Sequence, residues 1–114
     1  MKFKVLFAPE VQQKLGKIAK DFLSDIKKLK KIVACIENEC ENHEDLRKKA
    51  GIKKIVTSKN GYKLEFGKQH RALLTIEDDE IKIREVFYET KASDYSRILN
   101  TLFKQDVFYP KKWG

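Results

Sequence analysis

The segment from residue 62 to residue 95 constrains the fold of this chain more than any other part of the sequence. It is predicted to form three short strands joined by tight turns, followed by the start of a helix. Successive side chains of a strand point to opposite faces of the sheet. Tyr62, Leu64 and Phe66 are therefore predicted to share an apolar face, with Lys63 and Glu65 on the other.

The next strand continues the same alternation. One face is predicted to carry His70, Ala72, Leu74 and Ile76, and the other to carry Arg71 with Leu73 and Thr75. A small sheet with one apolar face and one face bearing Lys and Arg is suited to bind phosphate. The pattern indicates RNA chemistry or an acidic protein partner.

The residues before this segment predict a strand and two helices. Phe3, Val5 and Phe7 alternate with other residues as in a strand, and Pro9 suits the first turn of a helix that extends to residue 22. A cap at Ser24 or Asp25 is predicted to open a second helix. Its apolar positions are Ile26, Leu29, Val33 and Ile36, opposite lysines that are expected to face solvent.

The remaining connections are predicted from turn residues. The polar segment 37–49 is interpreted as a frayed helix end and a loop, and residues 52–58 as an additional strand. Asn60-Gly61 and Asp78-Asp79 are predicted turns, and the broken alternation at Arg84-Glu85 predicts a bulge or a strand covered on both sides. Ser93 or Asp94 is predicted to cap a final helix that ends at Phe103. The predicted fold is a single α+β domain, residues 1–114, in which an N-terminal strand and a helix hairpin pack on a small antiparallel sheet with a C-terminal helix.

Composition limits the classes of function. The 114 residues suffice for one domain with its own core, and the net charge of +8 favours polyanionic partners, although a lysine-rich protein without such a partner is the alternative. No segment approaches the ~20 apolar residues of a membrane helix, and the apolar N-terminal stretch is too short for a secretory signal. Cys35 and Cys40 lie roughly 140° apart on a helix and are interpreted as unlinked thiols of a cytoplasmic protein. A metal site that adds His43 is disfavoured, because no second ligand cluster follows.

Together these features resemble the RelE/ParE toxin family, the toxin components of bacterial type II toxin–antitoxin modules. The resemblance covers residues 3–100 and rests on the order of Tyr62-Lys63-Leu64, Arg71-Ala72-Leu73-Leu74 and Asp78-Asp79. It implies an mRNA interferase, a ribosome-dependent endoribonuclease that inhibits translation and needs no metal or other cofactor. It also implies a cognate antitoxin, expected to be an acidic and partly disordered chain.

The resemblance implies roles for particular residues. Lys63 matches a basic position that can act as a base, Arg71 an arginine that binds the reacting phosphate, and Tyr95 a tyrosine that holds the nucleotide. Lys91, Arg84 and Tyr88 are the further residues expected to bind RNA.

The sequence also departs from the family pattern. Glu65 stands where some members carry a second lysine, and Glu89 follows Tyr88 where an arginine or histidine is common. Either glutamate is a candidate base, or else a salt-bridge partner that neutralises the basic face; Arg71 paired with Glu65 across adjacent strands is that alternative. The protein would then be a homologue with a degenerate catalytic face, or a binder like the gyrase-inhibiting branch of the fold.

Three further placements follow from the sequence. His70 is expected to be buried or half-buried, and Tyr95 to pack under the last helix unless it is catalytic. The aromatic and basic tail, residues 107–114, either stacks on RNA bases or folds back over apolar surface, and the second arrangement is favoured.

Overall fold

A computed structural model describes residues 2–56, 60–89, 107–111 and 113 of the chain. The predicted final helix, from Ser93 or Asp94 to Phe103, lies outside these residues, and so do Lys91 and Tyr95. Within the described residues, every helix is too short or too polar to span a bilayer.

The sheet contains five strands in the order β1-β5-β4-β3-β2. Their bounds are β1 Lys4–Phe7, β2 Lys53–Lys54, β3 Gly61–Glu65, β4 His70–Glu77 and β5 Glu80–Tyr88. Strands β2 to β5 are antiparallel, as the meander predicted, whereas β1 joins the edge of β5 in parallel. Of the predicted additional strand at 52–58, the described residues 52–56 contain the two strand residues of β2, and residues 57 and 58 lie outside the described part.

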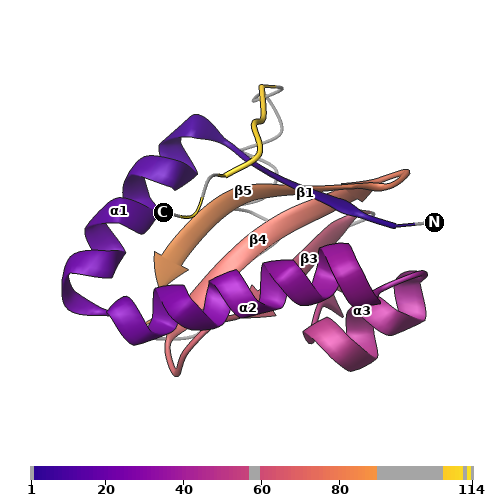
Figure 1. The fold of residues 1–114 in the computed structure, drawn as a ribbon, viewed down its shortest axis with the longest axis horizontal. Helices are drawn as coiled ribbons and strands as arrows, with labels where there is room; N and C mark the ends of the chain where they lie inside the picture. Colours follow the sequence, from indigo (N-terminus) through magenta and orange to yellow (C-terminus); the bar gives the residue numbers. More distant parts are fainter. Residues whose placement is uncertain (1, 57–59, 90–106, 112, 114) are drawn as a thin grey trace.

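Three helices precede the meander, and Figure 1 shows α2 in front of the sheet. Their bounds are α1 Pro9–Asp21, α2 Leu23–Glu39 and α3 His43–Ala50. The predicted apolar stripe of α2 is confirmed, because Leu29, Val33 and Ile36 are buried and Ile26 packs against the same core. Each such buried side chain stabilises the fold by about 1.5–3 kcal/mol. The strand β5 ends at the junction between α1 and α2, where Tyr88 contacts Phe22.

The start of α2 differs from the prediction. The helix begins at Leu23, and Phe22 occupies the N-cap position without a side-chain hydrogen bond. Ser24 and Asp25 therefore lie inside the first turn, and the predicted cap was wrong. The carboxylate of Asp25 instead approaches the ring of His70 in β4.

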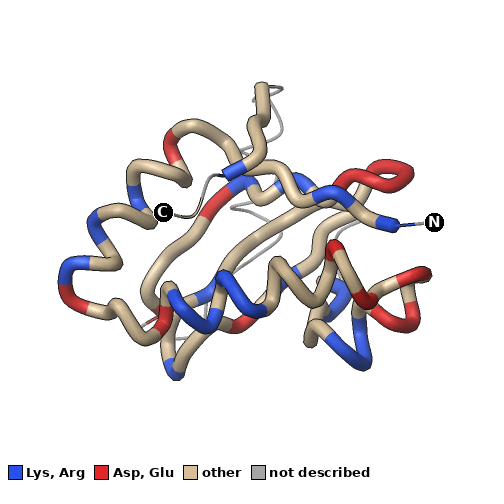
Figure 2. Tube along the Cα trace, in the orientation of Figure 1, with Lys and Arg blue, Asp and Glu red and all other residues tan. Residues whose placement is uncertain are grey.

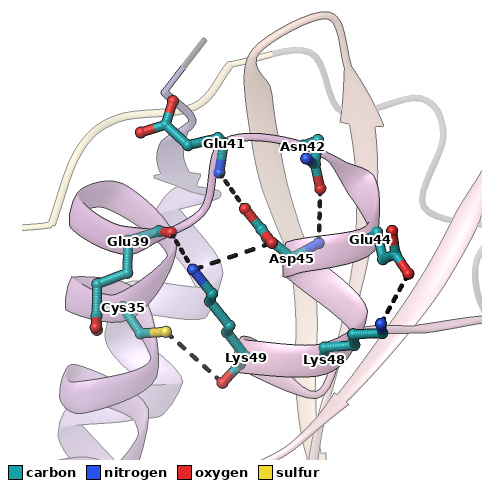
Figure 3. A network of polar contacts seen from close by, with 8 residues as sticks. All are labelled: Cys35, Glu39, Glu41, Asn42, Glu44, Asp45, Lys48 and Lys49. Carbon is teal, nitrogen blue, oxygen red and sulfur yellow. Dashed lines mark hydrogen bonds and ion pairs between the residues drawn. The ribbon is translucent and has the colours of Figure 1, made fainter.

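The polar segment predicted as a loop contains the helix α3. Asn42 caps it by accepting a hydrogen bond from the backbone N–H of Asp45, and Gly51 ends it in the left-handed conformation at φ 75°. Figure 3 shows that Lys49 of α3 donates to the carbonyl of Glu39 at the end of α2. Within α3 itself, Glu44 pairs with Lys48 on the helix surface. The loop prediction was wrong because capping and side-chain pairing compensate for the polar composition.

The predicted bulge and the Asp78-Asp79 turn are confirmed. Leu73 pairs with Glu85 and Leu74 with Ile83, so Arg84 is the extra residue of β5. Asp78 adopts a positive φ of 55° in the turn between β4 and β5.

The described part of the tail folds back on the domain. Tyr109 forms two backbone hydrogen bonds with Phe7, and Phe108 and Trp113 pack against the core. This arrangement confirms the favoured interpretation of the tail.

Figure 2 shows basic residues distributed along α1 and α2, where Lys27, Lys28, Lys30 and Lys31 are exposed as predicted.

Candidate functional site

The sheet has two faces with different surroundings. Its helix face carries Leu64, Ala72 and Leu74, which belong to the main core under α1 and α2. Its second face carries Leu73, which clusters with Ile55 and Phe87. Alternation along β4 places Arg71 on the second face, as the sequence predicted.

Arg71 lies among two carboxylates and two backbone carbonyls. Its Nε is 2.9 Å from Oε2 of Glu89 and 3.8 Å from Oε1 of Glu65. Its Nη1 donates to the carbonyl oxygens of His70, at 3.0 Å, and Lys68, at 3.2 Å. Only 13% of the Arg71 side chain is exposed, and 16% of that of Glu89, whereas half of the Glu65 side chain is in solvent. Arg71 is therefore a partly buried guanidinium with one close carboxylate partner, Glu89, and one more distant partner, Glu65.

The expected ion pair between Arg71 and Glu65 is therefore present, although its geometry is loose. The two residues are direct neighbours across β3 and β4. Because Glu65 is half exposed, this contact contributes no more than about 1 kcal/mol. The contact with Glu89 is closer and less exposed, so Glu89 is the main partner of Arg71.

Lys63 also lies on the second face, one diagonal step from Arg71. It pairs directly with Leu73 of β4 and with Lys53 of β2. Diagonal neighbours across an antiparallel pair have Cβ atoms about 7–8 Å apart, within reach of long side chains. The structure thus brings Lys63, Glu65 and Arg71 together on one face, as predicted.

Arg84 is buried, with 5% of its surface exposed. Its Nε donates to the hydroxyl of Thr75 at 2.8 Å, and its guanidinium carbon is 5.0 Å from the centre of the Phe108 ring. Burial lowers the pKa of Arg84, and the nearby carboxylate of Glu77 partly opposes this shift. A guanidinium enclosed in this way holds the tail to the sheet, which argues against the direct RNA contact predicted for it.

Tyr88 is 46% exposed at the end of β5. Its hydroxyl is hydrogen-bonded to the side chain of Gln69, and its ring lies 5.8 Å from that of Phe22. It pairs with His70 across the strands and contacts the ring of His70, which places it on the helix face. Tyr88 can therefore reach a ligand at the rim of the sheet, but from the opposite face to Arg71.

Sequence reasoning missed the partner of His70. The prediction of a buried histidine is confirmed, because His70 is only 2% exposed. Its Nδ1 lies 2.8 Å from Oδ2 of Asp25, and the ring of Phe66 stacks on it with 5.4 Å between centroids. The only sequence signal was an acidic residue in the first turn of a helix, and a local pattern gives no indication of a partner 45 residues away.

The two cysteines lie at the end of α2, where Cys40 is buried and Cys35 is half-buried. Burial raises the pKa of Cys40 to about 11 and raises that of Cys35 as well. The thiol of Cys35 donates to the carbonyl oxygen of Lys49 at 3.6 Å. Neither cysteine is in a disulfide, and among the described residues no His, Cys, Asp and Glu side chains cluster as metal ligands would.

Comparison with known proteins identifies the fold. No protein-family model matches the sequence, and no curated protein matches it. Among solved structures, the YoeB–YefM complex from Staphylococcus aureus matches with a TM-score of 0.54 at 19% identity, over 78% of this chain and 99% of that one. The YoeB dimer from the same organism matches with a TM-score of 0.52 at 16% identity over the same shares.

These likenesses confirm the α+β fold that the sequence predicted, since this chain shares the architecture of the YoeB structures. At identities below one fifth they show the fold alone.

Proposed function

We propose that this chain is the toxin of a type II toxin–antitoxin module and that it is an endoribonuclease that cuts mRNA on the ribosome. The observation that carries the proposal is Arg71 on the second face of a RelE-like sheet, with carboxylates beside it. An arginine binds phosphate through its planar fork, and a nearby carboxylate can take a proton. These are two of the functions that RNA cleavage without a metal requires, and the third is a proton donor for the leaving 5′-oxygen.

In the proposed reaction, a carboxylate takes the proton of the ribose 2′-hydroxyl while the 2′-oxygen attacks the adjacent phosphorus. The bond from phosphorus to the 5′-oxygen breaks, and the departing 5′-oxygen takes a proton from water. The products are a 2′,3′-cyclic phosphate and a 5′-hydroxyl. Arg71 compensates the charge that develops on the phosphoryl oxygens. Glu65 is the better-placed base, since it is half exposed and only loosely paired, whereas Glu89 orients the guanidinium.

The other site residues stay predictions. Lys63 is proposed to bind the same phosphate from the neighbouring strand, or to serve as the base. Lys91 and Tyr95, which lie outside the described residues, are proposed to contact the nucleotide. Action on translated mRNA would place the protein in the cytoplasm.

The proposed partner is a cognate antitoxin. One structure with the same fold is a YoeB–YefM complex, and the net charge of +8 favours an acidic chain. Charged rim contacts would weaken with salt, while apolar contacts would persist.

A second candidate function is supported by the same carboxylates. Glu65 and Glu89 together neutralise Arg71, as expected of a homologue with a degenerate catalytic face or of a toxin that binds gyrase. Such a protein would arrest growth through DNA damage without cutting mRNA.

Inducible expression in a bacterial host, followed by primer extension on abundant messages, distinguishes these functions. The nuclease produces growth arrest and new 5′ ends inside translated codons, and Arg71→Ala relieves the arrest and strongly reduces the new 5′ ends, leaving a slow residual cleavage. Arg47→Ala is the matched control, because Arg47 is an exposed arginine on α3. Arrest without cuts favours the gyrase-binding function, and the absence of arrest favours the degenerate homologue.

A further inference from the structure

The turn between β3 and β4 holds both members of the Arg71–Glu89 pair by its backbone. The carbonyl oxygens of Lys68 and His70 accept from the guanidinium of Arg71. The carbonyl oxygen of Gln69 accepts from the backbone N–H of Glu89 at 2.7 Å. Three carbonyls of one short segment therefore fix where these two residues lie, and a shift of the turn moves both.

The same turn is anchored to α2 through Asp25. The carboxylate of Asp25 approaches His70 at the C-terminal end of the turn and lies directly against Gly67 within it. Gly67 has a positive φ of 86°, and a Cβ atom there would be 2.2 Å from the carboxylate carbon. The space that Asp25 occupies exists only because residue 67 lacks a side chain.

The contact between Asp25 and His70 is shielded from solvent, and aromatic rings pack around it. His70 is 2% exposed, and 13% of the Asp25 side chain is accessible. Phe22 contacts the His70 ring from the helix side, at 4.9 Å between centroids, while Phe66 stacks on it. A hydrogen bond shielded from water is stronger than one at the surface, so the turn has little freedom relative to α2.

We propose that Asp25 is a positioning residue: through His70 and Gly67 it fixes the turn whose carbonyls hold Arg71 and Glu89 in the geometry for cleavage. The inference rests on the proposed nuclease function. Asp25 lies on the helix face and does not touch the substrate, so its effect passes through the turn. Misplacement of a phosphate-binding group by about 1 Å can lower a rate by up to about 100-fold.

The test is a double-mutant cycle on the full chain, with ribosomes carrying a short defined mRNA. Cleavage is measured under single-turnover conditions for wild type, Asp25→Asn, Arg71→Ala and the double variant. Asp25→Asn is expected to lower the maximal cleavage rate about tenfold, with little change in the concentration that gives half-maximal rate. In the Arg71→Ala background the same change should have almost no further effect on cleavage, although it lowers the melting temperature equally in both backgrounds.

The control is Asp45→Asn on α3, which also changes an aspartate in the first turn of a helix but has no contact with the β3–β4 turn. It should lower the melting temperature without slowing cleavage. If Asp25→Asn slows cleavage by the same factor with and without Arg71, Asp25 acts only through general stability and the proposal is overturned.

Failure of the proposed function is recognised separately, because the wild type would then leave the mRNA intact. The positioning is still testable by NMR of protein labelled with ¹⁵N-arginine. Asp25→Asn, or Gly67→Ala if the first variant does not fold, should shift the Arg71 Nε–H signal and speed its hydrogen exchange. An unchanged Arg71 signal in a folded variant refutes the proposal.

Discussion

Gly67→Ala should destabilise the protein far more than an ordinary glycine replacement. Placing a residue with a side chain at the φ of 86° lowers the free energy of unfolding by about 1–2 kcal/mol. The new Cβ also collides with the carboxylate of Asp25, which must leave His70. Loss of that buried hydrogen bond to a charged group costs a further 1.5–3 kcal/mol or so. The free energy of unfolding should therefore fall by about 2.5–5 kcal/mol.

The same reasoning predicts strong non-additivity. Asp25→Ala alone should cost about 1.5–3 kcal/mol, because it removes the same hydrogen bond. The double variant should lose no more free energy of unfolding than Gly67→Ala alone, because the hydrogen bond between Asp25 and His70 can be lost only once. Urea unfolding monitored by circular dichroism measures all three free energies.

Gly16→Ala is the matched control for this cycle. Gly16 lies inside α1, and a Cβ atom there would meet no other atom within 4 Å. Alanine should therefore stabilise the protein by about 0.5–1 kcal/mol, through its better helix propensity. Additive losses in the double variant, or a Gly67→Ala loss no larger than the backbone strain, would refute the close approach of Asp25 to the turn.

Three further predictions concern other parts of the molecule. Asn42→Ala should lower the free energy of unfolding by about 1 kcal/mol in urea, because it removes the cap of α3; no loss would argue against that cap. The raised pKa of Cys40, about 11, keeps its thiol neutral in the fold, so stability should be complete below pH 9 and fall as the pH rises from 9 towards 11. Cys40→Ala should lose less stability over that interval, and an identical pH profile would contradict the assignment. Arg84→Met should weaken binding of a short RNA less than Lys63→Ala in fluorescence anisotropy, since Arg84 is buried, and the reverse order would contradict its structural role.

Local patterns in the sequence predicted the elements that have a periodic signal. The stripe of α2 and the alternation of β3 and β4 identified much of the core, and the broken alternation at Arg84 indicated the bulge. The same patterns placed Arg71 with Lys63 and Glu65, because alternation determines the face of a strand.

The features that were missed depend on long-range contacts or on capping. No local signal connects Asp25 to His70, since the fold alone brings α2 against the β3–β4 turn. The helix α3 is mostly polar, and only Asn42 and Gly51 mark its ends, so composition suggested a loop. The burial of Arg84 depends on Phe108, which reaches the sheet from the tail.

The proposed nuclease function is tested most directly by the chemistry of the cut ends. Purified protein is incubated with ribosomes carrying a defined mRNA, and the products are labelled by polynucleotide kinase without prior phosphatase treatment. Cleavage through a 2′-oxygen attack predicts downstream fragments with a 5′-hydroxyl, which label at once, and a strong decrease of these fragments in Arg71→Ala but not in Arg47→Ala. Intact mRNA, fragments that label only after phosphatase treatment, or undiminished cleavage by Arg71→Ala would contradict the proposed function and its site.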